Sequence, residues 1–494
     1  MSLEGSALQR ASALVAQVRE RPPVVAVIGD LILDSWWLGE AERVTREAPA
    51  PVLRLEDVVD VAGGAANTAA NLRALGAEVR TVGVAGRDPE GDRLLQALLR
   101  AGLDTAGIVR TGAATTIKTR VVGSDSVMLR VDSGPHRPAD DELERLAEAA
   151  VRAADGADAV LVCDYGSGIL RAAVEHVLAA SRPGLLVIDA HELADWAFAR
   201  PDLVTPNAKE AERLLGETLG RGSERAAAVR AAADRLRERS GARHVVVTLD
   251  RDGAAALDAD GSITRTFAQP AEEKQASGAG DTFAATATLA LAAGRSLATA
   301  VDLAQAAADV VVQRPGTSVC TADDLTASLA APGAVVLGED GLVEVLAEEA
   351  RRGRRIVFTN GCFDVLHRGH TAYLRQAREL GDVLVVAVND DDSVRRLKGE
   401  GRPINPEGDR AGVIAELGCV DYVTLFSGDT PIPLLERVHP DVYVKGGDYA
   451  PDMLAEAVVV RSYGGTVTTV GYVSEHSTTE MVQRIRSSAQ PGPS

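Results

Sequence analysis

The chain has 494 residues, which is too long for one typical domain, so we expect two or three. Its hydrophobic content of 46% is ample for buried cores, and because aromatic residues make up only 3%, Ala, Val and Leu must build them. The net charge of −19 argues against binding to nucleic acid or to an anionic membrane.

The four cysteines form no CxxC pattern and no disulfide framework, so they indicate the reduced thiols of a cytoplasmic protein. The N-terminus lacks the apolar core of a signal peptide, and no uninterrupted apolar run approaches membrane-spanning length. The sequence therefore predicts a soluble, cytoplasmic protein that binds neither membranes nor nucleic acid.

Short apolar, β-branched runs recur along the chain, with helical stretches such as 139–154, 208–215 and 224–240 between them. This alternation predicts an α/β fold, in which parallel sheets carry helices on both faces. Each apolar run ends near Asp or Asn, and ligands bind at such strand ends, although these residues also end strands simply as turn formers. The eight residues are Asp30, Asp164, Asp189, Asn207, Asp250, Asn360, Asn389 and Asp448.

A stretch at 328–341 is rich in small residues, Gly and Pro and has no clear periodicity, which is typical of a linker. We therefore expect a first domain at 1–330, a linker at 331–344 and a second domain at 345–494. Its last residues, 487–494, are expected to be disordered.

In the first domain, Gly278-Ala279-Gly280-Asp281 precedes a long Ala-rich helical pattern. Glycines let the backbone fold around a phosphate, and the helix dipole adds to such an anion hole. Asp281 could accept the proton of a sugar hydroxyl as that hydroxyl attacks the γ-phosphate of ATP. A lone Gly-x-Gly is more often only a turn. The polar stretch before it does not fit a Rossmann fingerprint, and no Walker A motif is present.

Four further motifs occur in the order of the ribokinase-like (PfkB) sugar kinases, and the first domain therefore resembles that family. The resemblance implies a ribokinase-like α/β/α sandwich, ATP as a substrate with Mg²⁺, and Asp281 as the catalytic base. It implies an anion hole at Gly278, Ala279 and Gly280, sugar binding by Asp30, Asp34, Gly63, Gly64 and Asn67, and ATP and magnesium binding by Asn207, Glu210, Thr248 and Gly253.

Two positions depart from this family's pattern. Gln275-Ala276-Ser277 stands where the family usually has Asp-x-Thr, and that Asp commonly supports a monovalent cation, so a need for potassium is left open. Asp189-Ala190-His191 stands where near relatives carry Asp-Pro-Lys. The departures keep a second interpretation open, in which the N-terminal half is a degenerate kinase that only senses a sugar phosphate.

In the second domain, an apolar run ends in Thr359-Asn360-Gly361 and leads to His367-Arg368-Gly369-His370. A strand, a glycine turn and a helix start are expected, which places both histidines on one face of the helix N-terminus. The N–H groups and the dipole there attract anions. No set of Cys, His, Asp or Glu at metal-ligand spacing accompanies the pair, so we expect no zinc site.

This segment resembles the HxGH signature of the cytidylyltransferase-like nucleotidyltransferases, which implies a Rossmann-like α/β domain. It implies that His367 and His370 stabilise the pentavalent phosphorus formed when a sugar 1-phosphate attacks a nucleoside triphosphate, with Mg²⁺ on the triphosphate. A solvated face is the alternative for Lys398, Arg402 and Arg410. The expected nucleotide-binding residues are Asn360, Gly361, Phe363, Asp364, Asn389, Lys398, Arg402, Arg410, Lys445, Gly446, Asp448, Ser477, Thr478 and Thr479.

Taken together over residues 22–486, the two halves resemble the bifunctional heptose 7-phosphate kinase and heptose 1-phosphate adenylyltransferase family. The resemblance implies phosphorylation of D-glycero-β-D-manno-heptose 7-phosphate at its anomeric hydroxyl, removal of the 7-phosphate by a separate phosphatase, and AMP transfer from ATP to give ADP-heptose. It also implies a homo-oligomer, a dimer through the kinase domain. Another sugar, and CTP in place of ATP in the second domain, stay open.

Overall fold

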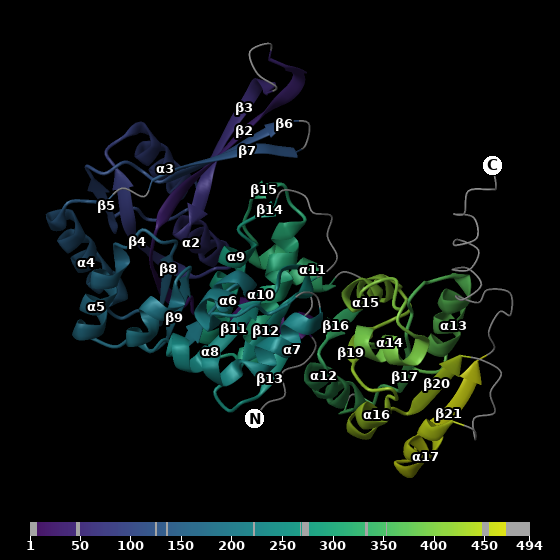
Figure 1. The fold of residues 1–494 in the computed structure, drawn as a ribbon. Helices are drawn as coiled ribbons and strands as arrows, with labels where there is room; N and C mark the ends of the chain where they lie inside the picture. The colour runs from purple at the N-terminus through teal and green to yellow at the C-terminus, as the bar shows by residue number, and fades with distance from the viewer. Residues whose placement is uncertain are drawn as a thin grey trace.

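The computed structural model describes residues 7–45, 50–123, 126–134, 137–220, 223–266, 268, 276–330, 334–351, 353–446 and 454–470. They form an N-terminal domain that runs to α11 and a C-terminal domain that starts at β16 (Figure 1). None of the described helices has the length and apolar character needed to cross a bilayer.

A nine-stranded sheet is the middle layer of the N-terminal domain. Its strands run parallel from β11 to β5, whereas β12 is antiparallel to both of its neighbours. Across the sheet the order is β13 (Ile263–Thr266), β12 (Ala254–Leu257), β11 (His244–Thr248), β10 (Leu203–Val204), β9 (Leu186–Ala190), β8 (Ala159–Asp164), β1 (Val24–Gly29), β4 (Glu78–Gly86) and β5 (Ile108–Thr111).

Helices cover both faces of this sheet, because its strands are apolar on both sides. In β1, Val25 and Val27 pack into one core, while Ala26 and Ile28 pack into the other. One face carries α1 (Ala7–Glu20), α2 (Ala65–Ala74), α3 (Pro89–Arg100), α9 (Ala279–Ala292), α10 (Leu297–Val312) and α11 (Ala322–Ala330). The opposite face carries α4 (Asp140–Ala154), α5 (Leu170–Ala180), η1 (Leu193–Ala199), α6 (Ala208–Leu215), α7 (Ser223–Ala231) and α8 (Ala233–Ser240). The predicted α/β/α sandwich is thus confirmed.

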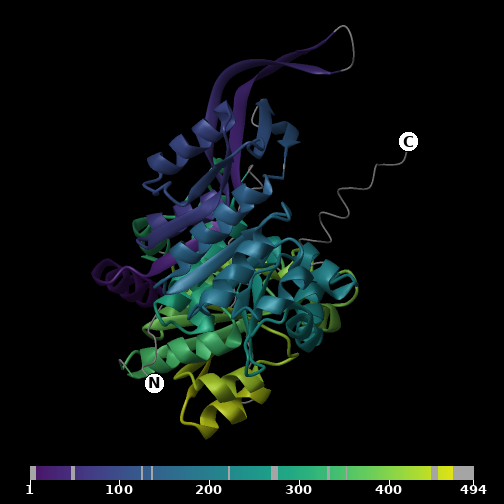
Figure 2. The same ribbon diagram turned by 90° about the vertical axis from the view of Figure 1, so that its left-hand side faces the viewer.

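A separate four-stranded sheet projects from this sandwich, and we call it the lid sheet. The hairpin of β2 and β3 forms its longest part and extends well beyond the sandwich (Figure 2). The lid sheet has the order β3 (Pro51–Gly64), β2 (Leu31–Val44), β6 (Ile117–Gly123) and β7 (Ser126–Ser133). Two short strands, β14 (Ala276–Ser277) and β15 (Gly316–Thr317), pair next to it (Figure 1).

The C-terminal domain is built on a six-stranded parallel sheet, as predicted for a Rossmann-like unit. Its order is β16 (Val335–Leu337), β19 (Tyr422–Phe426), β18 (Val383–Asn389), β17 (Ile356–Gly361), β20 (Val442–Gly446) and β21 (Thr466–Val470). One face packs on α13 (Arg368–Arg378) and α15 (Glu407–Ala415), and the other on α12 (Glu339–Arg351), α16 (Ile432–Val438) and α17 (Ala455–Ser462). The helix α14 (Asp391–Lys398) follows β18.

The stretch that we predicted as a linker contains secondary structure. Val335–Leu337 form β16, which pairs in parallel with Tyr422–Thr424, and α12 begins at Glu339. The three apolar residues of β16 are flanked by Gly and Pro, which hid the strand in the sequence. Residues 331–333 and the predicted disordered tail lie outside the described residues, and the domain boundary stays a prediction.

The two domains meet where β13 lies against β16. At this junction Arg265 of β13 forms an ion pair with Glu407, at 3.4 Å between Nη1 and Oε1. The backbones are also close, because a Cβ atom added to Gly338 would lie 3.1 Å from the carbonyl oxygen of Arg265. The junction therefore joins the edge strands of two sheets.

The buried side chain of Asn71 ties three segments of the N-terminal domain together. Its Oδ1 accepts the N–H of Cys320 at 3.0 Å and lies 3.0 Å from the hydroxyl of Thr282 in α9, while its Nδ2 donates to the carbonyl of Asn67 at 3.0 Å. Its side chain is fully buried, so water cannot replace these partners when they are lost.

We expect Asn71→Ala to lower the free energy of unfolding by about 2–4 kcal/mol, because it leaves the buried N–H of Cys320 unsatisfied and removes the hydrogen bond to the Thr282 hydroxyl. Urea unfolding followed by tryptophan fluorescence measures this domain alone, since all three tryptophans, at 36, 37 and 196, belong to it. The matched control is Arg73→Ala on the exposed face of α2, which should stay within about 0.5 kcal/mol of the parent. Equal, small effects of both changes would contradict this role of Asn71.

Candidate active sites

The first candidate site lies at the carboxyl ends of the central strands of the nine-stranded sheet. Asp30 follows β1, Asp164 ends β8, Asp189 lies near the end of β9, and Asn207 follows β10. The N-terminus of α9, with Asp281 in its first turn, faces the same edge. These four strand-end residues therefore lie along one edge of the sheet, whereas Asp250, which the sequence also singled out, is exposed and pairs with Arg225.

Asp281 is held by a donor on each of its two carboxylate oxygens. Asn67 donates to Oδ2 at 2.8 Å, and the hydroxyl of Tyr165 donates to Oδ1 through a short hydrogen bond. Burial raises the pKa of Asp281, while the hydrogen bonds from Tyr165 and Asn67 oppose that rise. The result is a carboxylate of enhanced basicity in a fixed orientation.

At several glycines in this site a side chain would collide with a neighbouring residue. Gly278 caps α9 with φ of 94°, in the left-handed region, and an added Cβ would lie 2.4 Å from Nδ2 of Asn67. At Gly63, an added Cβ would lie 2.7 Å from the carboxyl carbon of Asp34. Gly64 begins α2 beside it, also with positive φ. The glycines of both motifs are thus needed for the close approach of α9, α2 and the lid sheet.

The lid sheet supplies the positive charge of the site. Arg120 of β6 donates to Oδ1 of Asp34 at 2.8 Å and to the hydroxyl of Ser277 at 3.0 Å. Thr317 donates to the other oxygen of Asp34 at 2.9 Å. Lys118 lies on the same face of β6 as Arg120, with its Nζ 5.5 Å from the ring centre of Tyr165.

Asp30, which we predicted to bind sugar, has its carboxylate occupied by the loop after β8. The backbone N–H of Tyr165 donates to Oδ2 at 2.9 Å, the N–H of Ser167 does so at 3.3 Å, and the hydroxyl of Ser167 donates to Oδ1. Burial raises the pKa of Asp30, while these hydrogen bonds oppose that rise. In this structure, Asp30 therefore fixes the loop that carries Tyr165.

Asn207 and Glu210 form a capping box at the start of α6. The side chain of Asn207 accepts the N–H of Glu210 at 3.0 Å, and Glu210 accepts the N–H of Asn207 at 2.8 Å. Asn207 also bridges Thr248 at the end of β11, and Gly253 follows in the turn after η2 (Asp250–Asp252). The four residues predicted to bind ATP and magnesium therefore lie on two neighbouring strand ends.

An open cleft of about 650 Å³ lies over the start of α6, lined by His191, Asn207, Lys209, Glu210 and Arg213 among others. Nε2 of His191 is 3.8 Å from Oε1 of Glu210. Burial, together with Glu210 and Asp281, raises the pKa of the Asp189 carboxyl well above its usual range. This cleft is wide enough for a nucleotide, and acidic groups stand between it and Asp281.

Magnesium that arrives with a nucleotide fits this donor set. Mg²⁺ prefers oxygen ligands and is usually held by one or two carboxylates together with substrate phosphates. Glu210 and Asp189 are two such carboxylates. Burial raises the pKa of Asp189 most, the charge of Glu210 adds to that rise, and a cation between the two groups would relieve their repulsion. No group of three or more His, Cys, Asp or Glu among the described residues is arranged to hold a metal by itself.

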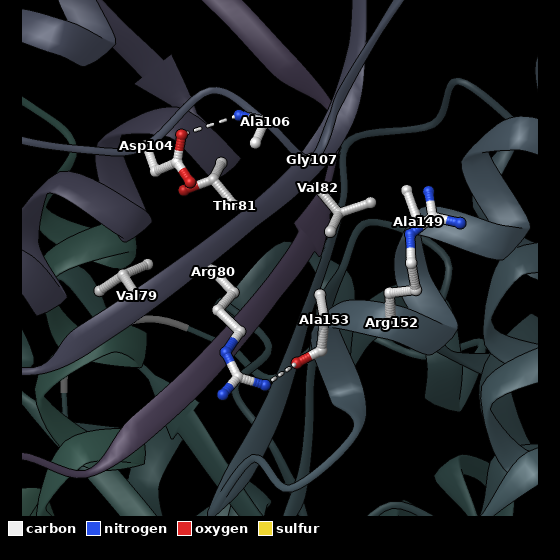
Figure 3. Close-up of a pocket in the computed structure, with 10 residues that line it drawn as sticks. All are labelled: Val79, Arg80, Thr81, Val82, Asp104, Ala106, Gly107, Ala149, Arg152 and Ala153. Carbon is white, nitrogen blue, oxygen red and sulfur yellow. Dashed lines mark hydrogen bonds between the residues drawn. The ribbon is translucent and has the colours of Figure 1, made fainter.

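A second cavity, of about 230 Å³, lies at the opposite end of the sheet (Figure 3). Val79–Val82 line it from the amino-terminal half of β4, and α4 closes it through Ala149, Arg152 and Ala153. Arg80 donates to the carbonyl of Ala153 at 3.1 Å and so caps the end of α4. Because the active-site residues lie at the carboxyl ends of the strands, this cavity is not part of the first site.

The second candidate site lies at the N-terminus of α13 in the C-terminal domain. His367 is the N-cap, and its Nδ1 accepts the N–H of Gly369 at 3.1 Å. His370 lies against it, with 4.0 Å between the two ring centres, so the predicted pair is adjacent in the structure. Burial, with help from His367 and Lys398, lowers the pKa of His370 to about 4.

Asp364 and Arg402 form an ion pair beside this helix start. Asp364 also accepts the N–H groups of Ile404 at 2.6 Å and Asn405 at 3.2 Å, which orders the loop after α14. These bonds hold the pKa of the carboxyl below its usual range despite its burial.

The sequence leaves two interpretations of Arg410, phosphate binding and a solvated face. In the structure its side chain is buried, with 2% of the residue exposed. Its guanidinium donates to Asp391 at 2.7 Å and to the carbonyls of Cys362 and Asn405 at 2.5 and 3.0 Å. The solvated alternative is wrong for this residue, because it links three loops from within the core.

Most of the remaining predicted nucleotide-binding residues that the structure describes lie at or just after the ends of β17, β18 and β20. Asn360 accepts from Lys445 at 3.0 Å and from the hydroxyl of Tyr443 at 2.7 Å. Burial lowers the pKa of Lys445. Asn389 ends β18, Lys398 is exposed at the end of α14, and Phe363 packs on His370 with a positive φ of 46°. Gly361 and Gly446 close β17 and β20.

Several predicted residues fall outside the described part of the chain. They are Asp448 and the Ser477, Thr478 and Thr479 segment in the second domain, and Gln275 in the first. Their roles stay predictions.

The sequence reasoning missed three residues that the structure places in the first site, Lys118, Arg120 and Tyr165. Lys118 and Arg120 alternate within an apolar strand, so both point to one face, and that pattern was a usable signal. Nothing in the sequence marked Tyr165, because only the fold brings its hydroxyl to Asp281.

Comparisons with known proteins agree with this two-site architecture. Residues 24–324 match the pfkB family carbohydrate kinase model, and residues 358–489 match the cytidylyltransferase-like model. The chain is 41% identical over 466 residues to the bifunctional protein HldE of Pseudomonas paraeruginosa, covering 94% of this chain and 97% of that protein. It is 40% identical over 471 residues to HldE of Azotobacter vinelandii, covering 94% and 98%.

This chain belongs to the HldE family.

Solved structures extend the likeness of this HldE-family chain to its N-terminal fold. Phosphofructokinase-2 from Escherichia coli in complex with fructose-6-phosphate matches with a TM-score of 0.52 and 24% identity, covering 63% of this chain and 98% of that one. Its crystal with potassium matches with a TM-score of 0.54 and 24% identity, with the same coverage. At this identity the likeness establishes the fold, and potassium is a finding about that enzyme.

We expect His370 to remain neutral from pH 5.5 to 8, since its lowered pKa of about 4 places the titration below that range. Histidine ring ¹³Cε1–¹H spectra recorded against pH test this, with His370→Gln used to assign the resonance among eight histidines. A resonance that titrates near the ordinary value of about 6.5 would show that burial does not govern this imidazole.

Proposed function

We propose that the two sites perform the two nucleotide-dependent steps of ADP-heptose synthesis. The first site transfers the γ-phosphate of ATP to the anomeric hydroxyl of D-glycero-β-D-manno-heptose 7-phosphate, which gives the 1,7-bisphosphate and ADP. The second site transfers AMP from ATP to heptose 1-phosphate, which gives ADP-heptose and pyrophosphate. A separate phosphatase must remove the 7-phosphate between the steps. The observation that carries the proposal is the end-to-end match to HldE of a chain that holds both sites.

In the kinase step, Asp281 accepts the proton of the anomeric hydroxyl as that oxygen bonds to the γ-phosphorus. The bond from the γ-phosphorus to the β,γ-bridging oxygen breaks, and ADP leaves. The N–H groups at the start of α9 stabilise charge on the transferred phosphoryl group. Mg²⁺ would neutralise the nucleotide phosphates beside Glu210 and Asp189. Asp34 and Asn67 contact the sugar, while Lys118 and Arg120 offset its phosphate charge.

In the transferase step, a phosphate oxygen of the sugar 1-phosphate attacks the α-phosphorus of ATP, and the bond to the α,β-bridging oxygen breaks. His367 and His370 hydrogen-bond the pentavalent centre at the N-terminus of α13. The lowered pKa of His370 favours its neutral form, which would act as a hydrogen-bond donor and not as a fixed cation. Lys398, Lys445 and Arg402 surround the nucleotide phosphates, and no covalent enzyme intermediate is needed.

The alternative of a degenerate, sensing kinase domain rests on Gln275 and His191. The geometry around Asp281 supports an active kinase, because both of its carboxylate oxygens are held by donors beside the N-terminus of α9. His191 lies on the nucleotide side of the site, beside Glu210. It therefore bears on ATP binding and leaves the base in place.

The lid sheet offers a surface for a homodimer. Trp37 pairs with Val58 and Val121, and Val121 pairs with Leu129, so their side chains share the face turned away from the site. This face exposes 41% of Trp37, 40% of Val58 and 56% of Leu129. Contiguous exposed apolar residues of this kind are typical of an interface, so we propose that two copies pair through them.

The function is tested by mass spectrometry of the purified protein with Mg-ATP and heptose 7-phosphate, where the 1,7-bisphosphate is expected. Asp281→Asn should lower the kinase rate by about 10²–10⁴ and leave adenylyl transfer unchanged. His370→Ala should do the reverse, lowering adenylyl transfer by about 10²–10³. Each variant is the folding control for the other. A wild-type protein that makes ADP-heptose but no bisphosphate would support the sensing alternative.

We expect Leu129→Glu to convert the dimer to a monomer, because it places a charge on the apolar face of the lid sheet. Light scattering after size exclusion separates the two masses, since one chain weighs 51.5 kDa. The control is Val458→Glu on α17, which is 76% exposed outside this face and should leave the mass unchanged. A wild-type protein that already elutes as a monomer would contradict the proposed interface.

A further inference from the structure

Tyr165 has a position in the first site that its sequence does not reveal. It follows β8 directly, and its hydroxyl donates to Oδ1 of Asp281, while Asn67 donates to Oδ2. Each carboxylate oxygen still has a lone pair, so a sugar hydroxyl can also approach. Tyr165 is the only tyrosine in the first 330 residues, and it is half-buried beside Asp281.

Several contacts hold the loop of Tyr165 in this position. Its backbone N–H donates to Asp30 at 2.9 Å, and the hydroxyl of Ser167 donates to the same carboxylate. The N–H of Gly166 donates to Oδ1 of Asp164 at 3.0 Å. The ring edge meets His191, with 5.3 Å between ring centres. The loop is therefore fixed independently of Asp281, and the tyrosine hydroxyl is aimed at the base by the surrounding structure.

The electrostatics of the site make Tyr165 a donor over the whole working range of pH. Burial, followed by the charges of Asp281 and Asp189, raises the pKa of its phenol well above the ordinary value. The hydroxyl therefore keeps its proton at neutral pH. A hydrogen bond to the charged form of a carboxyl favours that form, so this bond lowers the pKa of Asp281 against its burial.

We propose that Tyr165 is a positioning residue of the kinase reaction, whose hydroxyl orients the Asp281 carboxylate so that it can accept the proton of the sugar hydroxyl. The inference rests on the proposed kinase function and deepens it. It also gives a role to Asp30, which acts through the loop and not by touching the sugar.

The charges that face Asp281 from other elements would remain in a Tyr165→Phe variant. They are Asp34 from β2, which raises the pKa of Asp281, Lys118 from β6, which lowers it, and Asp189 from β9. The thiol of Cys163 on β8 also faces it, and burial raises the pKa of that thiol well above its usual value. Loss of the phenol hydroxyl is thus the one change in the surroundings of the base.

The test is the pH profile of kcat/KM for the kinase step in Tyr165→Phe. The base must be ionised to act, so a raised pKa of Asp281 moves the acid limb to higher pH, by about one unit. At pH 7 we expect kcat to fall by about tenfold to a hundredfold, with KM for the sugar changed little, because the hydroxyl contacts the base and not the substrate. The adenylyltransferase rate of the same sample is the internal control and should not change.

An acid limb that stays at the wild-type position would overturn the proposal, whether the rate is unchanged or falls uniformly at every pH. A uniform fall is what a purely structural role produces. Failure of the kinase function itself is distinguishable, because then the wild-type protein makes no bisphosphate. In that case, carboxyl ¹³C spectra with aspartate labelling, assigned by Asp281→Asn, still decide. The Asp281 titration must move to higher pH in Tyr165→Phe, and coincident titrations would reject the hydrogen bond.

Discussion

Both candidate sites are built at the N-terminus of one helix, α9 in the first domain and α13 in the second, where the first N–H groups have no partner of the usual i−4 kind. The chain carries a net charge of −19, so its long-range field repels phosphates, and attraction must come from nearby dipoles and a few cations. The two helices differ in the residue that caps their N-terminus. α9 is capped by a glycine that leaves its first turn open, whereas α13 is capped by His367, which is itself part of the candidate site.

Each acidic side chain of the first site accepts hydrogen bonds that hold it in place. Arg120 and Thr317 hold Asp34, the Tyr165 loop holds Asp30, and Thr205 donates to Asp189 at 3.0 Å. Without these donors, carboxylates buried so close together would take up protons. The lid sheet is therefore an electrostatic part of the site as well as its cover, since its cations come from β6.

The fold class and the outline of both sites could be read from the sequence, because strand ends and glycine motifs are local signals. The Gly278 to Asp281 turn and the two histidines are examples, and both lie at helix starts as predicted. Arg410 shows the limit, since charge alone could not tell a phosphate ligand from a buried link between loops. Tyr165 and Asn71 show a second limit, because their partners lie far away in sequence and only packing brings them together.

The junction between β13 and β16 affects how far the edges of the two sheets are exposed. Each is the outermost strand of its sheet, and an outermost strand offers backbone groups that can pair with a foreign chain. Here the two edge strands lie against each other, and the ion pair of Arg265 with Glu407 of α15 lies at the same junction. The contact between the two domains thus reduces the exposure of two sheet edges at once. If the two domains were made as separate chains, each exposed edge strand would need other protection, such as charged side chains, proline or another partner.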